Sequence, residues 1–349
     1  MEQPIESNPE NKLNTEISNP SITHDEQPEF QSRIELEPLQ KAVNEIKKEI
    51  SKIIVGQEDL IELLIISILT NGHSLIEGVP GVAKTITAKL LAKTLDIDFS
   101  RIQFTPDLMP SDILGTSVFN VKTNEFEFKK GPIFSNLVLI DEINRAPAKT
   151  QAALFEVMAE RQITMDGICY EMEQPFLVFA TQNPIEQEGT YRLPEAQLDR
   201  FLFKISVHYP SLENEVQILK ENHKRRDIIN FDSIKPVLKA AEIAHFQQLI
   251  KQVVVEDHLL EYIAAIINNT RTNANLFLGA SPRASIAILN AAKANAAIQG
   301  RDFVTPDDIK RCTFAVLQHR LVLTPEREME AFTVDKVVNQ ILETLEIPR

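Results

Sequence analysis

The chain has 349 residues, a length that at roughly 150 residues per domain predicts about two domains and an appendage. Hydrophobic residues make up 43% and charged residues 25%, which is typical of a globular protein. Fifty acidic and 36 basic side chains give a net charge of -14, so the bulk charge does not favour a polyanion as partner. The first 40 residues alone hold nine acids and two bases, or -7, so about half of the net charge lies there.

The cysteine content and the distribution of apolar residues exclude several classes of protein. Only two cysteines are present, Cys169 and Cys312, and they can form neither a disulfide framework nor a four-ligand zinc site. The chain opens without a signal peptide, and no run of about 18 apolar residues could span a bilayer. These features predict a cytoplasmic protein without membrane insertion.

Residues 1–33 are predicted to be a disordered acidic and polar tail, because they lack apolar periodicity and are rich in Asn, Glu, Ser, Gln and Pro. Helical periodicity runs from Ile34 to Ile54, and residues 60–69 predict a buried helix. Short apolar runs then alternate with helical stretches, which is typical of a parallel sheet covered on both faces. The runs predict strands at His73–Glu77, Ile102–Phe104, Leu137–Ile140, Phe176–Ala180 and Leu202–Ser206.

Two segments that interrupt this alternation are predicted to be hairpins, near 117–128 and 162–172. The second contains Asp166-Gly167, a dipeptide typical of short hairpin turns. We therefore predict an α/β core at 34–209 that carries both hairpins.

The remainder of the chain, 210–349, is predicted to be all-α. Its apolar residues have helical spacing, and no strand is predicted after Pro210. Prolines are expected at the first position of helices, since their missing N–H is not needed there. The candidates are Pro236, Pro282, Pro306 and Pro325.

A phosphate-binding loop is predicted where the first strand meets a helix. The segment is Gly78-Val79-Pro80-Gly81-Val82-Ala83-Lys84-Thr85, which has P-loop spacing except for alanine in place of the second glycine. Backbone N–H groups and a helix N-terminus would hold phosphate oxygens, Lys84 would contact the β- and γ-phosphates, and Thr85 would ligate Mg²⁺. We expect a negative φ at Ala83, because alanine lacks the freedom of glycine. A plain Gly/Pro turn that ends in Lys-Thr remains the alternative at this point.

Two carboxylates, Asp141 and Glu142, follow an apolar strand. A core strand cannot bury an acid cheaply, so both acids are expected at its carboxyl end, where open parallel sheets bind ligands. We predict that Asp141 holds Mg²⁺ and that Glu142 orients or deprotonates the attacking water. Asn183 follows the next strand and could hydrogen-bond the γ-phosphate and the water, although Asn183-Pro184 also favours a turn.

Two arginines are further candidates. Arg200 precedes the last predicted strand, where a solvated surface arginine is the ordinary expectation. Ser281-Pro282-Arg283 predicts a helix start with Ser281 as N-cap. A cation in the first turn opposes the helix dipole, so Arg283 indicates an anionic partner.

Taken together, these motifs resemble the AAA+ ATPases and, within them, the MoxR group. The resemblance covers about residues 36–349 and implies an αβα sandwich with a parallel five-stranded sheet, followed by a helical lid. Its motifs are Val55-Gly56-Gln57, Gly78–Thr85, Gly131–Leu137, Asp141–Pro147, Glu160-Arg161-Gln162, Ala180–Pro184, Leu193–Phe203 and Gly279–Arg283.

The resemblance also implies roles for single residues. Val55 and Gly56 are similar to the segment that holds adenine, and Asn183 is similar to the first sensor. Arg283 is similar to the second sensor, which reaches from the lid, and Arg200 to the arginine finger donated to a neighbouring subunit. Such a finger would make hydrolysis depend on assembly.

The function implied by the resemblance is Mg²⁺-dependent hydrolysis of ATP to ADP and phosphate by a homo-oligomeric ring, expected to be hexameric. The work done would be chaperone-like remodelling or maturation of protein clients, with a partner that contains a von Willebrand factor A domain. Arg145 and Arg192 are alternative cations at the subunit interface.

Three other functions remain open. Replicative helicases share both hairpin insertions, so the chain could be a nucleic-acid motor. However, the second hairpin has no basic residue, and no nucleic-acid partner is expected. A metal-chelatase motor subunit is a relative of the leading hypothesis, and a nucleotide-gated scaffold would bind ATP and hardly hydrolyse it.

Overall fold

The computed structural model describes residues 33–184, 190–225 and 231–347. The predicted disordered tail, 1–33, lies outside these ranges except for Arg33.

Five parallel strands form the central sheet, in the order β2-β5-β8-β1-β9. All five predicted runs form strands, although β2 begins at Phe99, earlier than predicted. Because the strands are parallel, their carboxyl ends lie at one edge of the sheet and their amino ends at the other. Their bounds are β1 Ser74–Gly78, β2 Phe99–Gln103, β5 Leu137–Asp141, β8 Leu177–Gln182 and β9 Phe203–Val207.

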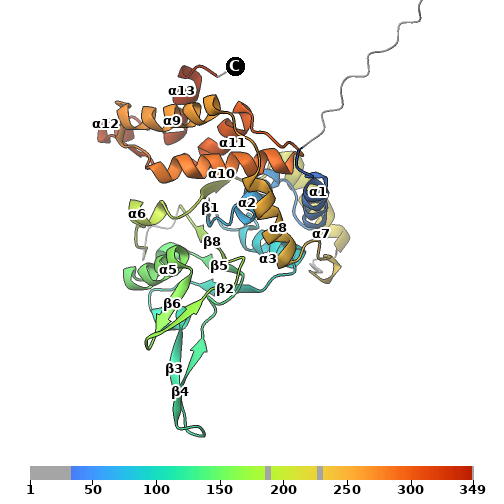
Figure 1. Cartoon of the computed structure of the whole chain (residues 1–349), viewed down its shortest axis with the longest axis vertical. Coiled ribbons are helices and arrows are strands. Elements are labelled where there is room, and N and C mark those ends of the chain that lie inside the picture. Colours follow the sequence, from blue (N-terminus) through green and yellow to red (C-terminus); the bar gives the residue numbers. More distant parts are fainter. Residues whose placement is uncertain (1–32, 185–189, 226–230, 348–349) are drawn as a thin grey trace, which may run out of the picture. The chain divides into compact units, whose positions relative to one another are not determined.

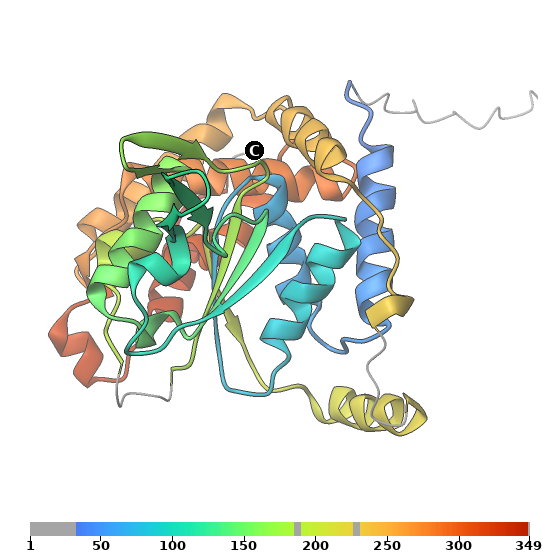
Figure 2. The ribbon, with the colours of Figure 1, turned by 90° about the horizontal axis from the view of Figure 1, so that it is seen from below.

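Helices cover both faces of this sheet, as Figures 1 and 2 show. Leu139 of β5 belongs to a core formed with helices on one face, whereas Val138 and Ile140 pack with Leu154 on the other. Alternate residues of one strand thus face different cores, which explains the continuous apolar run. The covering helices are α1 (Glu37–Ser51), α2 (Glu58–Leu69) and α3 (Lys84–Thr94) on the first face and α5 (Ala148–Glu160) on the second.

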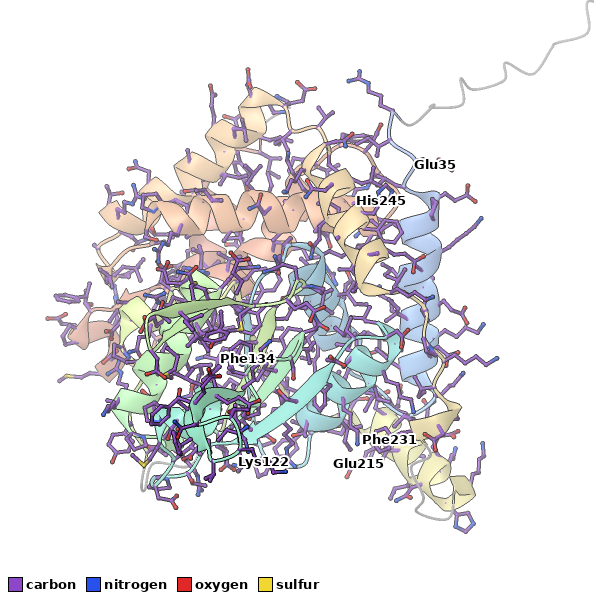
Figure 3. The ribbon with its side chains drawn as sticks, turned by 60° about the horizontal axis from the view of Figure 1, so that its bottom comes forward. Glu35, Lys122, Phe134, Glu215, Phe231 and His245 are labelled. Atoms are coloured by element: carbon purple, nitrogen blue, oxygen red, sulfur yellow. The ribbon has the colours of Figure 1, made fainter. Side chains whose placement is uncertain are left out.

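Two antiparallel hairpins are inserted in the core. In the second hairpin, Asp166 and Gly167 have φ of 52° and 80°, the left-handed pair that a tight two-residue turn requires. Figure 3 labels Lys122, which lies in the turn of the first hairpin. The strands are β3 (Gly115–Asn120), β4 (Glu125–Lys130), β6 (Gln162–Met165) and β7 (Ile168–Glu171); a short helix, α4 (Pro110–Leu114), precedes them, and a 3-10 turn, η1 (Ile143–Arg145), follows β5.

The described part of the chain after β9 is mostly helical. Pro282, Pro306 and Pro325 each occupy the first position of a helix, as predicted. None of the helices in the described ranges is long and apolar enough to cross a bilayer. The helices are α6 (Glu195–Leu198), just before β9, then α7 (Leu212–Arg225), η2 (Phe231–Ser233), α8 (Ala240–Lys251), α9 (Asp257–Thr272), α10 (Pro282–Ile298), α11 (Pro306–Leu317), α12 (Pro325–Met329) and α13 (Val334–Thr344).

Two expectations for this region are wrong. Two short strands, β10 (Leu276–Leu278) and β11 (Val322–Leu323), pair antiparallel, and such a distant pairing leaves no local periodicity in the sequence. Pro236 does not start a helix. The residues after it, Val237 and Leu238, donate their backbone N–H groups to the carbonyl of Thr94, which holds this segment against the end of α3.

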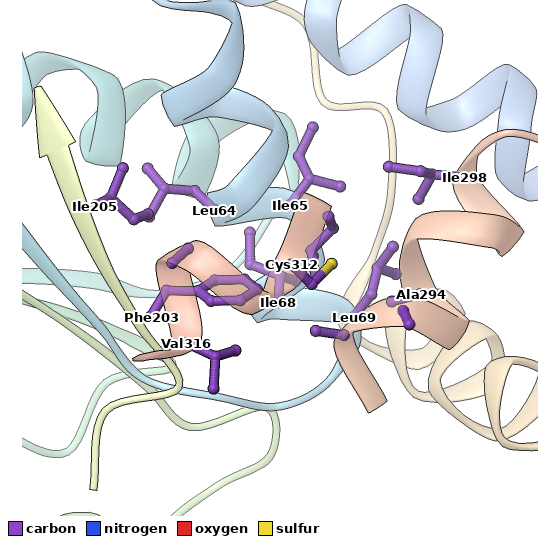
Figure 4. Packing of buried hydrophobic residues seen from close by; sticks show 14 of the residues in the cluster. Leu64, Ile65, Ile68, Leu69, Phe203, Ile205, Ala294, Ile298, Cys312 and Val316 are labelled. Carbon is purple, nitrogen blue, oxygen red and sulfur yellow. The ribbon is translucent and has the colours of Figure 1, made fainter. Parts of the chain in front are cut away.

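Helix α2 joins the sheet to the C-terminal helices. It is apolar on almost every side, and eight of its twelve residues are buried. Figure 4 shows Leu64 and Ile68 packed among Phe203 of β9, Ala294 of α10 and Cys312 of α11. The two parts of the chain therefore share one continuous apolar core around this helix.

Candidate active site

The predicted phosphate loop lies at the carboxyl edge of the sheet, between β1 and α3. Leu75 and Ile76 are fully buried, which fixes β1 and hence the start of the loop. At Gly78 a Cβ atom would lie 2.8 Å from the carbonyl oxygen of Val207 in β9. Glycine at this position is therefore required by the close approach of the two strands.

The backbone of Ala83 differs from the prediction. Its φ is +63°, in the left-handed region, so the expectation of a negative φ is wrong. Ala83 is the residue before α3, where the chain turns from the loop into the helix, and its carbonyl accepts hydrogen bonds from the N–H (2.9 Å) and the hydroxyl (3.0 Å) of Thr87. A left-handed backbone at alanine costs roughly 1–2 kcal/mol of conformational energy. The phosphate loop therefore contains a strained residue next to its phosphate-binding groups.

Lys84, the first residue of α3, reaches back over the loop. Its Nζ donates to the carbonyl oxygens of Gly78 at 2.5 Å and Gln182 at 3.3 Å. Its ammonium group thus lies between the ends of the neighbouring strands β1 and β8. This is a suitable position for binding phosphate oxygens at the sheet edge.

Asp141, at the end of β5, lies beside Thr85. Its side chain is only 5% exposed, and its carboxylate lies 3.3 Å from the Thr85 hydroxyl and accepts a 3.1 Å bond from Thr181. The Nε of Arg101 forms an ion pair with it at 2.6 Å. A hydroxyl and a carboxylate are the hard oxygen ligands that Mg²⁺ prefers, so these residues fit the predicted metal.

The protein supplies few ligands for such a metal. Within the described ranges, no group of three or more His, Cys, Asp or Glu residues could hold an ion. This accords with Mg²⁺, which usually binds to one or two carboxylates together with substrate phosphates and water.

Glu142 turns away from the end of β5 through a left-handed backbone (φ 58°, ψ 53°). Its N–H donates to the Thr181 hydroxyl at 3.1 Å. Its carboxylate accepts a 2.8 Å hydrogen bond from the Gln103 amide and lies 3.1 Å from the Nε of Arg145. These contacts orient the carboxylate beside, but apart from, that of Asp141.

Three residues of this site were not predicted from the sequence: Arg101, Gln103 and Thr181. The first two lie on the same face of β2, because side chains alternate along a strand, and Gln103 pairs in register with Asp141 of β5. The sequence does show polar residues on both sides of Ile102. Which residues of the next strand these side chains meet, however, depends on the strand register, which the sequence does not give.

These groups line one cavity of about 360 Å³. Most of the residues predicted for catalysis or phosphate binding thus line the same cavity. Asn183 is one of them and is only 8% exposed. The lining residues are Pro80, Gly81, Ala83, Lys84, Thr85, Ile86, Arg101, Gln103, Asp141, Glu142, Thr181 and Asn183.

A second cavity, of about 430 Å³, begins at the neighbouring strand. It is lined by Gly56, by Val207, which pairs in register with Gly78, and by Arg311 of α11. Gly56 has φ +72°, and a Cβ there would meet the Asn214 side chain at 2.3 Å. Val55 is half-buried and is not among the described residues that line this cavity.

Arg200 and Arg283 lie elsewhere. Arg200 is half-buried and donates to the carbonyl of Phe155 at 3.0 Å, whereas Arg283 is exposed in the first turn of α10. Neither is among the described residues that line the phosphate cavity. Of the alternative cations, Arg145 contacts Glu142, and Arg192 is exposed 3.4 Å from Glu195.

Ser281 has the extended backbone of an N-cap, but it does not cap α10 with its side chain. Its hydroxyl instead donates to Asp199 at 3.1 Å, and Asp199 also forms a 2.7 Å ion pair with the buried Arg320. The residue before Arg200 is thereby connected to the start of the helix that carries Arg283.

A glycine-containing loop that opens a helix, with two acids at the end of a nearby parallel strand, defines a P-loop nucleotide-binding protein. Two family models match the chain: the ATPase family associated with various cellular activities (AAA) over residues 73–203, and the AAA lid domain over residues 268–341.

Individual proteins are similar over most of the chain. The uncharacterized protein YeaC of Bacillus subtilis is 44% identical over 89% of this chain and 97% of its own length. Chaperone MoxR1 of Mycobacterium tuberculosis is 43% identical over 90% of this chain and 84% of its own length. A crystal structure of a protein from Cytophaga hutchinsonii has a TM-score of 0.82 at 42% identity, covering 89% and 96% of the two chains. The chain belongs to the MoxR family of AAA+ ATPases, and its activity is that of an ATPase.

Proposed function

We propose that the protein hydrolyses ATP with Mg²⁺ at the carboxyl edge of its sheet, and that residues 34–209 form the ATPase core and 210–349 the lid. One observation carries this proposal. The Thr85 hydroxyl and the Asp141 carboxylate lie 3.3 Å apart, and Glu142 projects into the same cavity. A metal-binding pair next to a separate, oriented carboxylate is what water attack on a phosphate requires.

Lys84 would bind the β- and γ-phosphates together with the N–H groups of residues 78–83. Thr85 and Asp141 would hold Mg²⁺, which when bound neutralises charge on the phosphate oxygens. Glu142 would accept the proton of the attacking water. The amide of Asn183 would orient that water and the terminal phosphate.

The adenine and the lid complete the binding mode. Val55 and Gly56 would hold the adenine, since Gly56 lines the cavity that begins beside the phosphate loop. Arg283 would reach the phosphates when the lid closes, because the first turn of α10 leaves it exposed.

We further propose a homo-oligomeric ring, of six subunits, in which Arg200 serves the neighbouring site. Its position outside the phosphate cavity of its own chain supports this role. A cation supplied across an interface stabilises transition-state charge only when subunits assemble.

The client is proposed to be a protein, bound through the two hairpins and with help from a von Willebrand factor A domain protein. The first hairpin exposes Phe119, Phe126 (74% exposed) and Val121 (83% exposed). It is attached to the second hairpin by the Phe128–Tyr170 ring contact, with centroids 4.6 Å apart. Exposed apolar side chains of this kind favour protein surfaces, and a relative similar over most of the chain is named a chaperone.

The alternatives of a nucleic-acid motor and a chelatase subunit are not favoured. Of the basic residues of the first hairpin, Lys130 lies over the Phe134 ring, 5.0 Å from its centroid, and Glu125 and Glu127 offset the charge of Lys122 and Lys129. A groove that tracks phosphates would need an excess of basic residues.

The activity is tested with two substitutions and one control. Glu142→Gln should bind ATP normally and lower turnover at least about 100-fold, because the base is removed while its size is kept. Lys84→Ala should weaken ATP binding itself. Glu160→Gln removes an exposed carboxylate at the end of α5 and should change neither. Normal turnover by Glu142→Gln would exclude the assigned base.

A further inference from the structure

A third cavity, of about 550 Å³, lies at the other edge of the sheet. Asn71 precedes β1 and Gln174 precedes β8, and both line it, so it adjoins the amino ends of two neighbouring strands. Gln247 of α8 and Asn290 of α10 line the facing wall. The cavity is therefore remote from the phosphate loop, which follows the carboxyl end of β1.

The charge of this cavity is of one sign. Arg161, Lys251 and Lys293 line it, and none of the described lining residues is Asp or Glu. The protein as a whole carries a formal charge of -14. Three cations without an acid are thus gathered in one hollow of an acidic protein, although like charges repel each other.

The hydrogen bonds of these cations go to neutral groups. Arg161 donates to the Asn71 carbonyl at 2.7 Å and to the Gln174 side chain at 3.0 Å. Lys293 donates to the Lys251 carbonyl at 3.0 Å. Across the described part of the chain, neither these two nor Lys251 has a carboxylate within ion-pair distance. Among the described residues, no carboxylate is therefore paired with any of these three cations.

Burial makes the positive charge of two of these cations less favourable. It lowers the pKa of Arg161 and of Lys293, since both cations are partly desolvated. The neighbouring His73 is buried, and its pKa falls to about 4, first because of burial and second because of the charge of Arg161. The charge of Arg161 therefore acts on a buried side chain of the core.

We propose that this cavity binds a small molecule that carries phosphate groups. The volume lies in the range of about 300–1,000 Å³ that small-molecule sites occupy. A phosphate carries close to two negative charges and several acceptor oxygens, which match three cations and the amide N–H groups of the lining Asn residues. The ligand would touch both the strand ends and helices α8 and α10, and so would join these two parts of the structure.

The site can be observed directly, because the chain contains no tryptophan. Gln248→Trp places a single fluorophore at the exposed rim of the cavity. Inorganic pyrophosphate is titrated in Mg²⁺-free buffer into the full chain, in a Lys84→Ala background that weakens the phosphate loop. We expect a saturable fluorescence change. Lys251→Gln and Lys293→Gln, added together, should weaken binding at least about 100-fold, since the loss of each bond from a cation weakens it about tenfold.

The matched control removes two exposed lysines elsewhere, Lys122→Gln and Lys239→Gln, and should leave the affinity unchanged. No saturable signal, or equal loss in both double variants, would overturn the proposal. The reporter is independent of ATP turnover, so a failure here is distinct from a failure of the proposed ATPase mechanism.

A second probe tests the class of ligand. Malonate has two carboxylates and a size similar to that of pyrophosphate, but fewer charges and oxygens. We expect pyrophosphate to bind more tightly to the Gln248→Trp reporter. Tighter binding of malonate would show that the site takes carboxylates and would contradict the assignment to phosphate.

Discussion

The two edges of the five-stranded sheet hold their charges differently: acids pair with cations at the carboxyl edge, whereas the cations that line the amino-edge cavity have no carboxylate of the described residues within ion-pair distance. At the carboxyl edge, Asp141 and Glu142 meet cations and amides from neighbouring strands and loops, with Arg101 at 2.6 Å from one and Arg145 at 3.1 Å from the other. At the amino edge, Arg161 donates to the Asn71 carbonyl and to the Gln174 side-chain amide oxygen.

The difference shows that one sheet can hold charged side chains in two ways, as ion pairs at one edge and as cations without a carboxylate partner among the described residues at the other. The acids at the carboxyl edge are paired in the isolated chain, so a metal must compete with Arg101 for Asp141. The cations at the amino edge have no acid to compete with, so an anion can bind without breaking an ion pair. We therefore expect substitutions of charged residues to have different effects at the two edges.

The largest effect is expected from Arg200, which in the proposed ring would serve the carboxyl edge of the neighbouring subunit. Arg200→Ala should lower ATP turnover about 1,000-fold, because a finger arginine stabilises transition-state charge. Nucleotide binding should remain, since Arg200 does not line the phosphate cavity. Turnover and fluorescent-nucleotide binding are measured on the same preparation.

Mixing subunits makes this prediction specific. Lys84→Ala subunits should be inactive but still carry Arg200, so adding them to Arg200→Ala subunits should restore part of the activity. Mixing in subunits with both substitutions should restore none. Absence of recovery in the first mixture would argue against a finger donated in trans.

A smaller effect is expected from acid at the amino edge. The pKa of His73 is lowered from about 6.5 to about 4, so between these values the unfolded chain binds a proton that the folded chain does not. The stability that His73 contributes is therefore fully present above pH 6.5 and is lost as the pH falls toward 4. From pH 7 to pH 5 this group alone should lower the free energy of unfolding by about 2 kcal/mol.

The check is urea unfolding at several pH values. Arg161→Gln should make the pH dependence shallower, because the charge of Arg161 contributes to the low pKa of His73. His245→Gln is the control: Figure 3 labels His245 on α8, where it is exposed, and its removal should leave the slope unchanged. An unchanged slope in Arg161→Gln would contradict an unneutralised charge at this edge.

The smallest effect concerns the ion pair of Arg101 with Asp141. Arg101 is 54% exposed, so its bond is worth no more than about 1 kcal/mol. Arg101→Met removes the competitor of Mg²⁺ and should lower the Mg²⁺ concentration for half-maximal nucleotide binding about fivefold. Lys41→Met, which removes a cation that is 74% exposed on α1, should have no effect. Weaker Mg²⁺-dependent binding in Arg101→Met would indicate that Arg101 contacts the nucleotide instead.

Much of this protein follows from local sequence patterns. Apolar runs predicted all five strands of the sheet, Asp166-Gly167 predicted a tight turn, and three prolines marked helix starts. The spacing from Gly78 to Thr85 and the acids after β5 predicted the nucleotide site. These features depend on residues within a few positions of one another, where chain geometry leaves little choice.

Tertiary structure decided the rest. The left-handed Ala83, the pairing of Gln103 with Asp141, and the bond from Ser281 to Asp199 depend on contacts between distant segments. The cavity around Arg161 depends on them too, because its walls come from the residues before β1 and β8 and from helices α8 and α10, which are distant from them in the sequence. Sequence periodicity states which side of an element is apolar, but only packing determines which polar side chains meet, since that depends on register and on the relative position of the elements.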